Sequence, residues 1–349
     1  MFESRDFAAL ARTKVDPLVW DFIEGGGGAE LTLEANRALF NAALLRPRVL
    51  VDVSRCDTST RLLGMDLPSP VGVAPLAYHR MVLDEGEVAT ARGLGGALMV
   101  ISIFASRTME EIAAAATGPL WMQLYWMRER RVLVDLVKRA QGLGFKAIVL
   151  TVDTPRIGIR LRDKRNDFGV PAHMSAVNVD HALMAATYGS DGIAEHARQT
   201  FDQSVTWSDL AWLKGLSDLP LVIKGVLTAE DAALAVEHGA DAIVVTNHGG
   251  RQLDGAIPSL RALPEVVAAV AGRCPVLLDG NVRSGRDVFV ALAMGASAVL
   301  VGRPVLWALA ADGSDGVLRL LGMLKEELEH TMALTGRPAV ARIDRSAMV

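Results

Sequence analysis

The sequence predicts an α/β fold, a closed (β/α)8 TIM barrel with an N-terminal helical cap and a long loop after strand four. From residue 71 onward, short and nearly continuous apolar segments alternate with amphipathic stretches. This pattern is typical of a parallel sheet that is buried on both faces. Eight such segments fit within roughly 250 residues, the usual size of this barrel. The predicted strands are 71–75, 98–103, 120–125, 147–153, 219–224, 242–247, 276–280 and 298–302.

Local signals mark where the intervening helices begin. Thr228 and Asp231 have the spacing of a capping box, which predicts a helix at Ala229–Glu237. Ser284 is the corresponding start signal for a helix at 286–293. Alternating strands and capped helices therefore support a parallel barrel.

A doubly wound open sheet is the main alternative fold. It is less favoured because no predicted strand is followed by a G-x-G-x-x-G dinucleotide fingerprint. The glycine run at 25–28 follows a helical stretch, not a strand. We therefore interpret it as a flexible turn without a phosphate-binding role.

The whole chain, 1–349, is predicted to form one domain. Residues 1–70 would be the helical cap and residues 71–340 the barrel. Between strand four and the next helix, the segment 154–206 is rich in charge, glycine, histidine and methionine. A loop of about fifty residues inside a compact domain is usually functional or mobile. On the active face of a barrel it would be a natural lid.

Composition limits the classes of partner. A net charge of −4 gives no electrostatic reason to expect nucleic acid or an acidic membrane. Two distant cysteines, Cys56 and Cys274, favour neither a disulfide framework nor a cysteine metal site, as is usual in a reducing compartment. The first fourteen residues lack the apolar core of a signal peptide, and no apolar run is long enough to cross a bilayer. We expect a cytoplasmic protein.

Polar side chains gather at one end of the predicted strands. In (β/α)8 barrels the active site lies at the C-terminal ends of the strands, so these positions identify candidate functional residues. A purely structural barrel would not need such varied polar residues there. The positions are Pro75, Leu76, Ala77, Ser102, Gln123, Tyr125, Thr151, Asp153, Lys224, Asn247, His248, Asp279, Gly280, Gly302 and Arg303.

Five of the candidate residues predict acid–base chemistry on an anionic substrate. His248 is the candidate general base because imidazole titrates near neutral pH. Asp153 could orient its ring or stabilise its charged form. Arg251 and Arg160 offer forked donors that suit a carboxylate. Lys224 places a positive charge where a reduced cofactor could develop a negative one.

Strands seven and eight predict a phosphate-binding site. Barrels commonly bind a phosphate group there, and this end of the sequence supplies Asp279, Gly280, Arg283, Gly302 and Arg303. One phosphate together with polar groups around a ring suggests a mononucleotide such as FMN.

Each of these residues has a structural interpretation when taken alone. A single histidine at a strand end is more often a satisfied structural residue, and the other six histidines are assigned to that class: His79, His173, His181, His196, His238 and His330. A metal site is not expected, because there is no H-E-x-x-H spacing and the cysteines do not cluster. A serine hydrolase would need a G-x-S-x-G elbow, which the sequence lacks.

The combination of motifs is specific to one family. The chain carries T-N-H-G-G-R-Q-L-D at 246–254, T-V-D-T-P-R at 151–156, Q-L-Y at 123–125, I-K-G-V at 223–226, L-D-G at 278–280 and V-G-R-P at 301–304. In these motifs it resembles the FMN-dependent 2-hydroxy-acid oxidases and dehydrogenases. Glycolate oxidase, lactate oxidase and mandelate dehydrogenase are members. The resemblance runs from about residue 2 to residue 332.

The resemblance implies an FMN-dependent (S)-2-hydroxy-acid oxidase and a role for each matched residue. His248 would take the hydroxyl proton of the substrate while a hydride equivalent leaves the α-carbon for the flavin, and Asp153 would support His248. Arg160 and Arg251 would clamp the carboxylate, and Tyr125 would hydrogen-bond the substrate. The implied cofactor-binding residues are Pro75, Leu76, Ala77, Ser102, Gln123, Thr151, Lys224, Thr246, Asp279, Gly280, Arg283, Gly302 and Arg303.

Departures from the family pattern carry the information on substrate. Phe22 stands where glycolate oxidase has a tyrosine that contacts the carboxylate, which leaves an apolar wall. The segments 74–80 and 123–126 look more like the 4-hydroxymandelate oxidase branch. Together these features predict an aromatic acid of mandelate or 4-hydroxymandelate type. Asn281 replaces the usual glycine beside the phosphate site.

The electron acceptor and the size of the substrate have alternatives. An oxidase would pass electrons to O2 and release H2O2, and Ala77 favours this by resemblance. A dehydrogenase would use a quinone or a carrier protein, although a long apolar insertion and a haem domain are both missing. The substrate could also be a small aliphatic acid such as lactate or glycolate. By analogy we expect a homo-oligomer, either a tetramer or an octamer.

A different class, a flavin-dependent isomerase or a regulatory flavoprotein, is less favoured. It would not explain why Arg160, Arg251, Tyr125 and His248 occur together.

Overall fold

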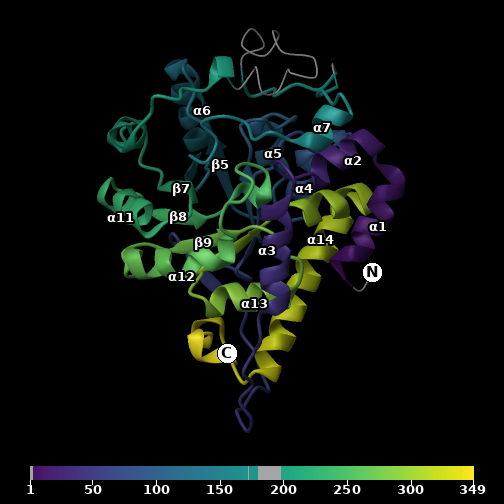
Figure 1. Ribbon diagram of the computed structural model, residues 1–349, viewed down its shortest axis with the longest axis vertical. Coiled ribbons are helices and arrows are strands. Elements are labelled where there is room, and N and C mark those ends of the chain that lie inside the picture. The colour runs from purple at the N-terminus through teal and green to yellow at the C-terminus, as the bar shows by residue number, and fades with distance from the viewer. Residues whose placement is uncertain (1–2, 172, 180–197) are drawn as a thin grey trace.

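The computed structural model describes residues 3–171, 173–179 and 198–349. At its centre, eight parallel strands form a closed barrel in which the last strand pairs with the first (Figure 1). The (β/α)8 prediction is therefore confirmed. The strands are β3 (Val71–Val73), β4 (Leu98–Ile101), β5 (Leu120–Leu124), β6 (Ile148–Thr151), β7 (Leu221–Val226), β8 (Ala242–Val245), β9 (Val276–Asp279) and β10 (Ala298–Val301).

Strand boundaries differ slightly from the prediction. Seven strands end one or two residues earlier than predicted, because their polar C-terminal residues already belong to the following loops. The exception is β7, which continues to Val226 through a register shift between Lys224 and Val226.

Helices surround the barrel (Figure 1). They are α4 (Glu87–Arg92), α5 (Met109–Ala115), α6 (Arg130–Gly142), α7 (Leu161–Arg165), α10 (Leu210–Lys214), α11 (Ala229–Glu237), α12 (Ser259–Val270), α13 (Gly285–Ala293) and α14 (Arg303–Leu334). Short 3-10 turns lie at η1 (His79–Met81), η2 (Trp207–Asp209), η3 (His248–Gly250), η4 (Val340–Arg342) and η5 (Arg345–Ala347).

Two predicted helix starts are confirmed by their caps. The Thr228 side chain accepts a hydrogen bond from the Asp231 amide at the start of α11. The Ser284 side chain does the same for Asp287 at the start of α13. Such caps satisfy amide groups that the first turn of a helix leaves without a partner.

The N-terminal seventy residues contribute α1 (Ser4–Lys14), α2 (Pro17–Glu24), α3 (Leu31–Ala42) and a hairpin of β1 (Thr60–Leu62) and β2 (Met65–Leu67). The helices match the expected cap, but the hairpin was not predicted. Its Leu62 and Leu67 belong to the hydrophobic cluster that fills the barrel, together with residues from the beginnings of strands such as Ala147 and Ala242. The hairpin therefore closes the N-terminal end of the barrel.

The barrel interior changes from apolar to polar along its axis. Side chains of a strand alternate between its two faces, and the lower interior positions carry Val100, Trp121, Val149, Val222 and Val244. Two residues further along the strands, the inward positions carry the buried polar residues Ser102, Gln123, Thr151, Lys224, Thr246 and Asp279. The period-two alternation thus places the predicted polar residues around one opening.

The segment 154–206 is only partly described. Residues 172 and 180–197, which include His181 and His196, lie outside the described residues, and so does that part of the predicted lid. None of the helices in the described ranges is long and apolar enough to span a membrane.

Leu62→Ala should destabilise the fold without altering the opposite, polar end of the barrel. Leu62 is 1% exposed, and removing a buried leucine side chain costs about 2–5 kcal/mol of unfolding free energy. Urea unfolding should show this loss. Leu50→Ala, at a fully exposed leucine, is the control and should change stability by less than about 0.5 kcal/mol. Equal losses of unfolding free energy in the two variants would contradict the conclusion that the hairpin closes the N-terminal end of the barrel.

Candidate active site

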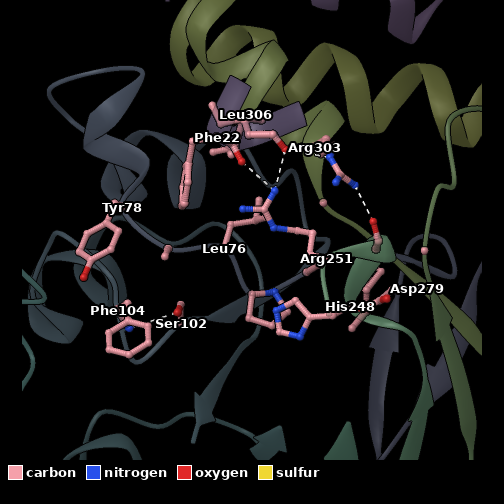
Figure 2. A pocket seen from close by; sticks show the side chains of 18 of the residues that line it. Phe22, Leu76, Tyr78, Ser102, Phe104, His248, Arg251, Asp279, Arg303 and Leu306 are labelled. Carbon is pink, nitrogen blue, oxygen red and sulfur yellow. Dashed lines mark hydrogen bonds between the residues drawn. The ribbon is translucent and has the colours of Figure 1, made fainter. Parts of the chain in front are cut away.

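A pocket opens at the C-terminal ends of the strands, where the sequence placed the active site. Figure 2 shows His248 and Arg251 on one side of it and Tyr78 and Phe104 on the other. Fifteen predicted site residues line the pocket: Phe22, Pro75, Leu76, Ala77, Ser102, Tyr125, Arg160, Lys224, His248, Arg251, Asp279, Gly280, Arg283, Gly302 and Arg303. Four others, Gln123, Thr151, Asp153 and Thr246, lie behind this wall and contact the lining residues or one another.

The imidazole of His248 is held by Asp153. Its Nδ1 lies 2.9 Å from Asp153 Oδ1, and both side chains are largely buried. Burial alone would raise the pKa of the Asp153 carboxyl, but the charge and hydrogen bond of His248, together with Lys224, hold that pKa below its usual value. An ionised Asp153 accepts a hydrogen bond from Nδ1–H and leaves Nε2 available as the base.

Gly225 makes this contact possible. Its φ of +123° lies in a region that L side chains rarely adopt. A Cβ on Gly225 would lie 2.7 Å from the Asp153 amide nitrogen and 2.8 Å from Asp153 Cβ. Because only glycine leaves this space, β7 can bulge beside Asp153 and the carboxylate can reach His248.

Lys224 forms a buried ion pair inside the barrel. Its Nζ lies 3.0 Å from Asp279 Oδ2, and both side chains are almost completely buried. Burial lowers the pKa of Lys224, but Asp279 and Asp153 outweigh that effect and raise it above its usual value. Thr246 donates a hydrogen bond to the other oxygen of Asp279. The pocket floor therefore carries a fixed ammonium group.

The neighbouring strands present a neutral polar surface. Gln123 Nε2 donates to Thr151 Oγ1 at 3.0 Å, and Gln123 Oε1 accepts from the Ile103 amide at 3.2 Å. Ser102 Oγ accepts from the Phe104 amide at 3.1 Å. Ser102 thus lines the pocket where a polar ring could be bound, and Gln123 and Thr151 are fixed directly behind it.

Two arginines approach the candidate base. Arg251 Nη1 donates to the carbonyl oxygens of Phe22 and Gly25 at 2.7 and 2.8 Å. The guanidinium groups of Arg251 and Arg160 lie over the Phe22 ring, with Cζ 5.0 and 5.4 Å from its centroid. Arg160 Nε is buried and has no partner within the described part of the chain. Burial lowers the pKa of both arginines, so a bound carboxylate would stabilise the pair.

The predicted phosphate arginines have different surroundings. Arg303 donates to the carbonyl oxygens of Ile23, Gly25 and Gly249 at 2.8, 2.9 and 3.1 Å. Arg283 lies over the Trp307 ring at 4.3 Å. Burial, followed by the charge of Arg303, lowers the pKa of Arg283 to about 9. Arg283 is therefore the more available donor for an anion, and Arg303 also ties the N-terminal segment to the barrel.

The backbone conformation of Asn281 explains how an asparagine can replace the usual glycine at this position. Its φ is +71°, a left-handed conformation that asparagine tolerates better than most residues. The backbone beside Gly280 can therefore keep a glycine-like path without a glycine.

The glycine run at 25–28 is a packed turn. The Gly27 amide donates to the Gly250 carbonyl at 2.8 Å. A Cβ on Gly27 would collide with the Gln252 carbonyl, and one on Gly28 would lie 2.7 Å from the Asp254 carboxylate. The run lets the N-terminal backbone lie directly against the loop after β8.

Sequence reasoning missed an aromatic wall. Tyr78, Phe104 and Phe201 line the pocket with Tyr125. The Tyr125 and Phe201 rings stack at 4.7 Å, and Phe104 lies 5.6 Å from Tyr125. Burial, reinforced by the Asp153 charge, raises the pKa of Tyr125, so its phenol stays neutral and can donate. No local pattern in the sequence signals that these four rings converge.

The residues fit a mononucleotide. A surplus of buried guanidinium groups faces the pocket near Arg283, whereas Ser102, Lys224 and the segment Pro75–Leu76–Ala77 line its remaining walls. A phosphate would compensate the guanidinium charges, and a flat polar ring would contact the neutral groups. Among the described residues no cluster of three or more potential metal ligands occurs.

The fold and the site define a (β/α)8-barrel protein whose pocket suits a mononucleotide and an anionic small molecule. Residues 11–349 match the family model of the FMN-dependent dehydrogenases, and the chain belongs to that family. It is 46% identical to glycolate oxidase 3 of Arabidopsis thaliana over 346 residues, which cover 98% of this chain and 94% of that protein. It is 45% identical to an L-lactate oxidase of Nostoc sp. over 355 residues, with 98% and 96% covered.

Solved structures give the same family. A crystal structure of mandelate oxidase with (S)-4-hydroxymandelic acid is similar with a TM-score of 0.95 and 44% identity, covering 100% of this chain and 98% of the other. Another mandelate oxidase structure is similar with a TM-score of 0.92 and 43% identity. The protein is an enzyme that uses FMN to oxidise a 2-hydroxy acid.

Gly225→Ala should impair turnover by displacing Asp153. The added Cβ would overlap Asp153, and loss of a positioned base typically costs about 100-fold or more; we expect a partial loss of about 10-fold in kcat. Gly64→Ala is the matched control, because Gly64 also has a positive φ but a Cβ there would meet nothing within 4 Å. Steady-state kinetics of both variants, with flavin content measured, checks this. Wild-type kcat in Gly225→Ala would refute the role of the bulge.

Proposed function

We propose that the enzyme oxidises an aromatic 2-hydroxy acid of mandelate or 4-hydroxymandelate type to the 2-oxo acid and passes the electrons to O2, which leaves as H2O2. The observation that carries the aromatic substrate is the wall of Tyr78, Phe104, Tyr125 and Phe201, which faces the same pocket as Arg251 and His248. Aromatic rings favour one another in offset or tilted contact at 4.5–7 Å, so a phenyl group would have ready partners.

The substrate carboxylate would bind Arg251 and Arg160. At the position where glycolate oxidase has a tyrosine, this chain has Phe22, and both guanidinium groups lie over its ring. Phe22 also stacks on Phe168 at 4.7 Å, which fixes it as an apolar wall. The neutral Tyr125 phenol would donate a hydrogen bond to the bound substrate.

His248 would remove the proton of the 2-hydroxyl group through Nε2, because Asp153 occupies Nδ1. Conversion of the alcohol to the ketone releases two electrons and two protons, and bound FMN supplies the capacity to accept the electron pair. Lys224 would stabilise negative charge near the pocket floor. Reduction of O2 to H2O2 consumes the same two electrons and two protons.

A small aliphatic substrate is the second candidate. The glycolate and lactate oxidases are 45–46% identical to this chain, as similar as the mandelate oxidases. The pocket walls favour the aromatic acid, since glycolate has no apolar group that could pack against the four rings.

We also infer that the chain is one domain. One hydrophobic cluster joins Phe7 and Phe40 of the N-terminal helices with Val73 of the barrel and Met348 near the C-terminus. A hydrophobic cluster shared by the N-terminal helices and the barrel supports a cap and barrel that fold together.

Anaerobic reduction of the flavin tests the substrate without requiring an acceptor. Holoenzyme is mixed with (S)- and (R)-mandelate, (S)-4-hydroxymandelate, glycolate and (S)-lactate, and the loss of oxidised-flavin absorbance is followed. One apolar group changes specificity by about 10- to 200-fold. The aromatic acid should therefore reduce the flavin at least about 10-fold faster than glycolate or lactate. Reduction by glycolate or lactate, with neither mandelate enantiomer active, would overturn the aromatic assignment.

Mixing the reduced enzyme with aerated buffer then tests the acceptor. Rapid return of flavin absorbance with stoichiometric H2O2 supports the oxidase. Sluggish reoxidation would assign a dehydrogenase. His248→Gln should bind FMN but reduce it far more slowly, and preserved turnover would refute the base assignment.

A further inference from the structure

The backbone that carries His248 has an unusual conformation. The φ angles of His248, Gly249 and Gly250 are +59°, +63° and +76°, all left-handed. Glycine adopts this region readily, whereas in a residue with a Cβ it is uncommon and carries a cost in strain. The conformation directs the imidazole toward Asp153, so whatever holds it also positions the base.

A buried pair of amide side chains holds this turn from outside the barrel. Asn36 Nδ2 donates to Asn247 Oδ1 at 2.9 Å, and Asn247 Nδ2 donates back to Asn36 Oδ1 at 2.9 Å. Asn36 and Asn247 are 2% and 4% exposed. A reciprocal pair of this kind, removed from water, is strong and allows little movement.

The amide pair connects directly to the backbone around His248. Asn247 Oδ1 also accepts from the Gly250 amide at 3.0 Å, and Asn247 Nδ2 also donates to the Ile257 carbonyl at 3.1 Å. Asn36 Oδ1 accepts from the Ser259 amide at 3.2 Å, while Ser259 Oγ accepts from the Asn247 amide at 3.2 Å. The Asn247 side chain thus binds the far end of the turn at Gly250, and Asn36 of α3 holds that side chain and the Ser259 amide.

The same face of α3 packs closely against the turn at a second point, Gly250. A Cβ on Gly250 would lie 2.7 Å from Leu33 Cα and 2.8 Å from the Leu33 amide nitrogen. Leu33 and Asn36 are three residues apart and share a helix face. Helix α3 is therefore a template against which the turn is formed.

We propose that Asn36 is a positioning residue for the base: its amide, on a helix outside the barrel, sets the left-handed turn that aims His248 at Asp153. This inference rests on the proposed role of His248. Asn36 touches neither the pocket nor the reacting atoms, and it acts through Asn247. The Arg251 amide donates to the His248 carbonyl at 3.3 Å, but its guanidinium is held separately by the carbonyls of Phe22 and Gly25, so the carboxylate clamp should depend on Asn36 much less than the base does.

Asn36→Asp is the sharpest substitution. It keeps the acceptor for the Ser259 amide but places a carboxylate oxygen opposite Asn247 Oδ1. A carboxylate has no N–H to donate to Asn247 Oδ1. Turning the Asn247 amide over would only bring its oxygen against the other carboxylate oxygen and the Ile257 carbonyl, and it would leave the Gly250 amide without its acceptor. Asn36→Ser, which is smaller and neutral, provides a second variant should the charged one fold poorly.

The experiment measures three quantities on the holoenzyme: the rate of flavin reduction by (S)-mandelate, the kinetic isotope effect with α-deuterated (S)-mandelate, and the Kd of benzoate, a carboxylate that cannot reduce the flavin. We expect the reduction rate to fall about 10- to 100-fold. The isotope effect should stay equal or increase, and the benzoate Kd should change less than about 3-fold, since the clamp is unaffected.

A stability control separates positioning from general damage. Thr58→Ala removes another buried side chain whose hydroxyl donates to a backbone carbonyl, that of Pro68 at 3.0 Å, in the segment that leads into the β1–β2 hairpin. It should lower Tm but leave the reduction rate unchanged.

Two results would overturn the proposal. One is a wild-type reduction rate in both Asn36 variants. The other is a parallel loss of benzoate binding and reduction rate, which would indicate a merely structural role. His248→Gln, measured alongside, distinguishes these results from failure of the base assignment, because that failure would leave His248→Gln active.

Discussion

The hydrogen bond between His248 and Asp153 is the contact on which the site depends. His248 follows β8 and Asp153 follows β6, so the bond passes over the strand between them, β7. Gly225, at the bulge of β7, leaves the space for it. The left-handed turn at His248 directs the imidazole toward Asp153, and α3 supports that turn from outside the barrel. Catalytic geometry here is a property of several packed elements, not of one loop.

Charge is the second constraint. Lys224, Arg160, Arg251, Arg283 and Arg303 are buried near one pocket, and burying charge is costly unless it is compensated. Asp279 compensates Lys224, Asp163 lies 3.7 Å from Arg160, and backbone carbonyls of the N-terminal segment compensate Arg251 and Arg303. The remaining demand is for anions, which a carboxylate substrate and a phosphorylated cofactor supply. The same electrostatics that bind the ligands thus tie the N-terminal segment to the barrel.

Much of the fold and of the site could be predicted from the sequence because the underlying rules are local. Apolar strands identified the barrel, and parallel strands bring their C-terminal residues, such as Lys224 and His248, to one opening. The amide pair of Asn36 and Asn247 could not be predicted, because it joins residues 211 positions apart. Phe201 arrives from the long segment after β6, and the β1–β2 hairpin has too little patterning. These features exist only after tertiary packing.

We propose that ionised Asp153 fixes the His248 imidazole so that Nε2 faces the substrate. Asp153→Asn tests it most directly, because the amide is almost isosteric but can hold the wrong tautomer. The rate of anaerobic flavin reduction by (S)-mandelate, measured from pH 5 to 9, should fall by about 100-fold or more, with FMN content unchanged. A reduction rate within about 3-fold of wild type across that range would contradict the account.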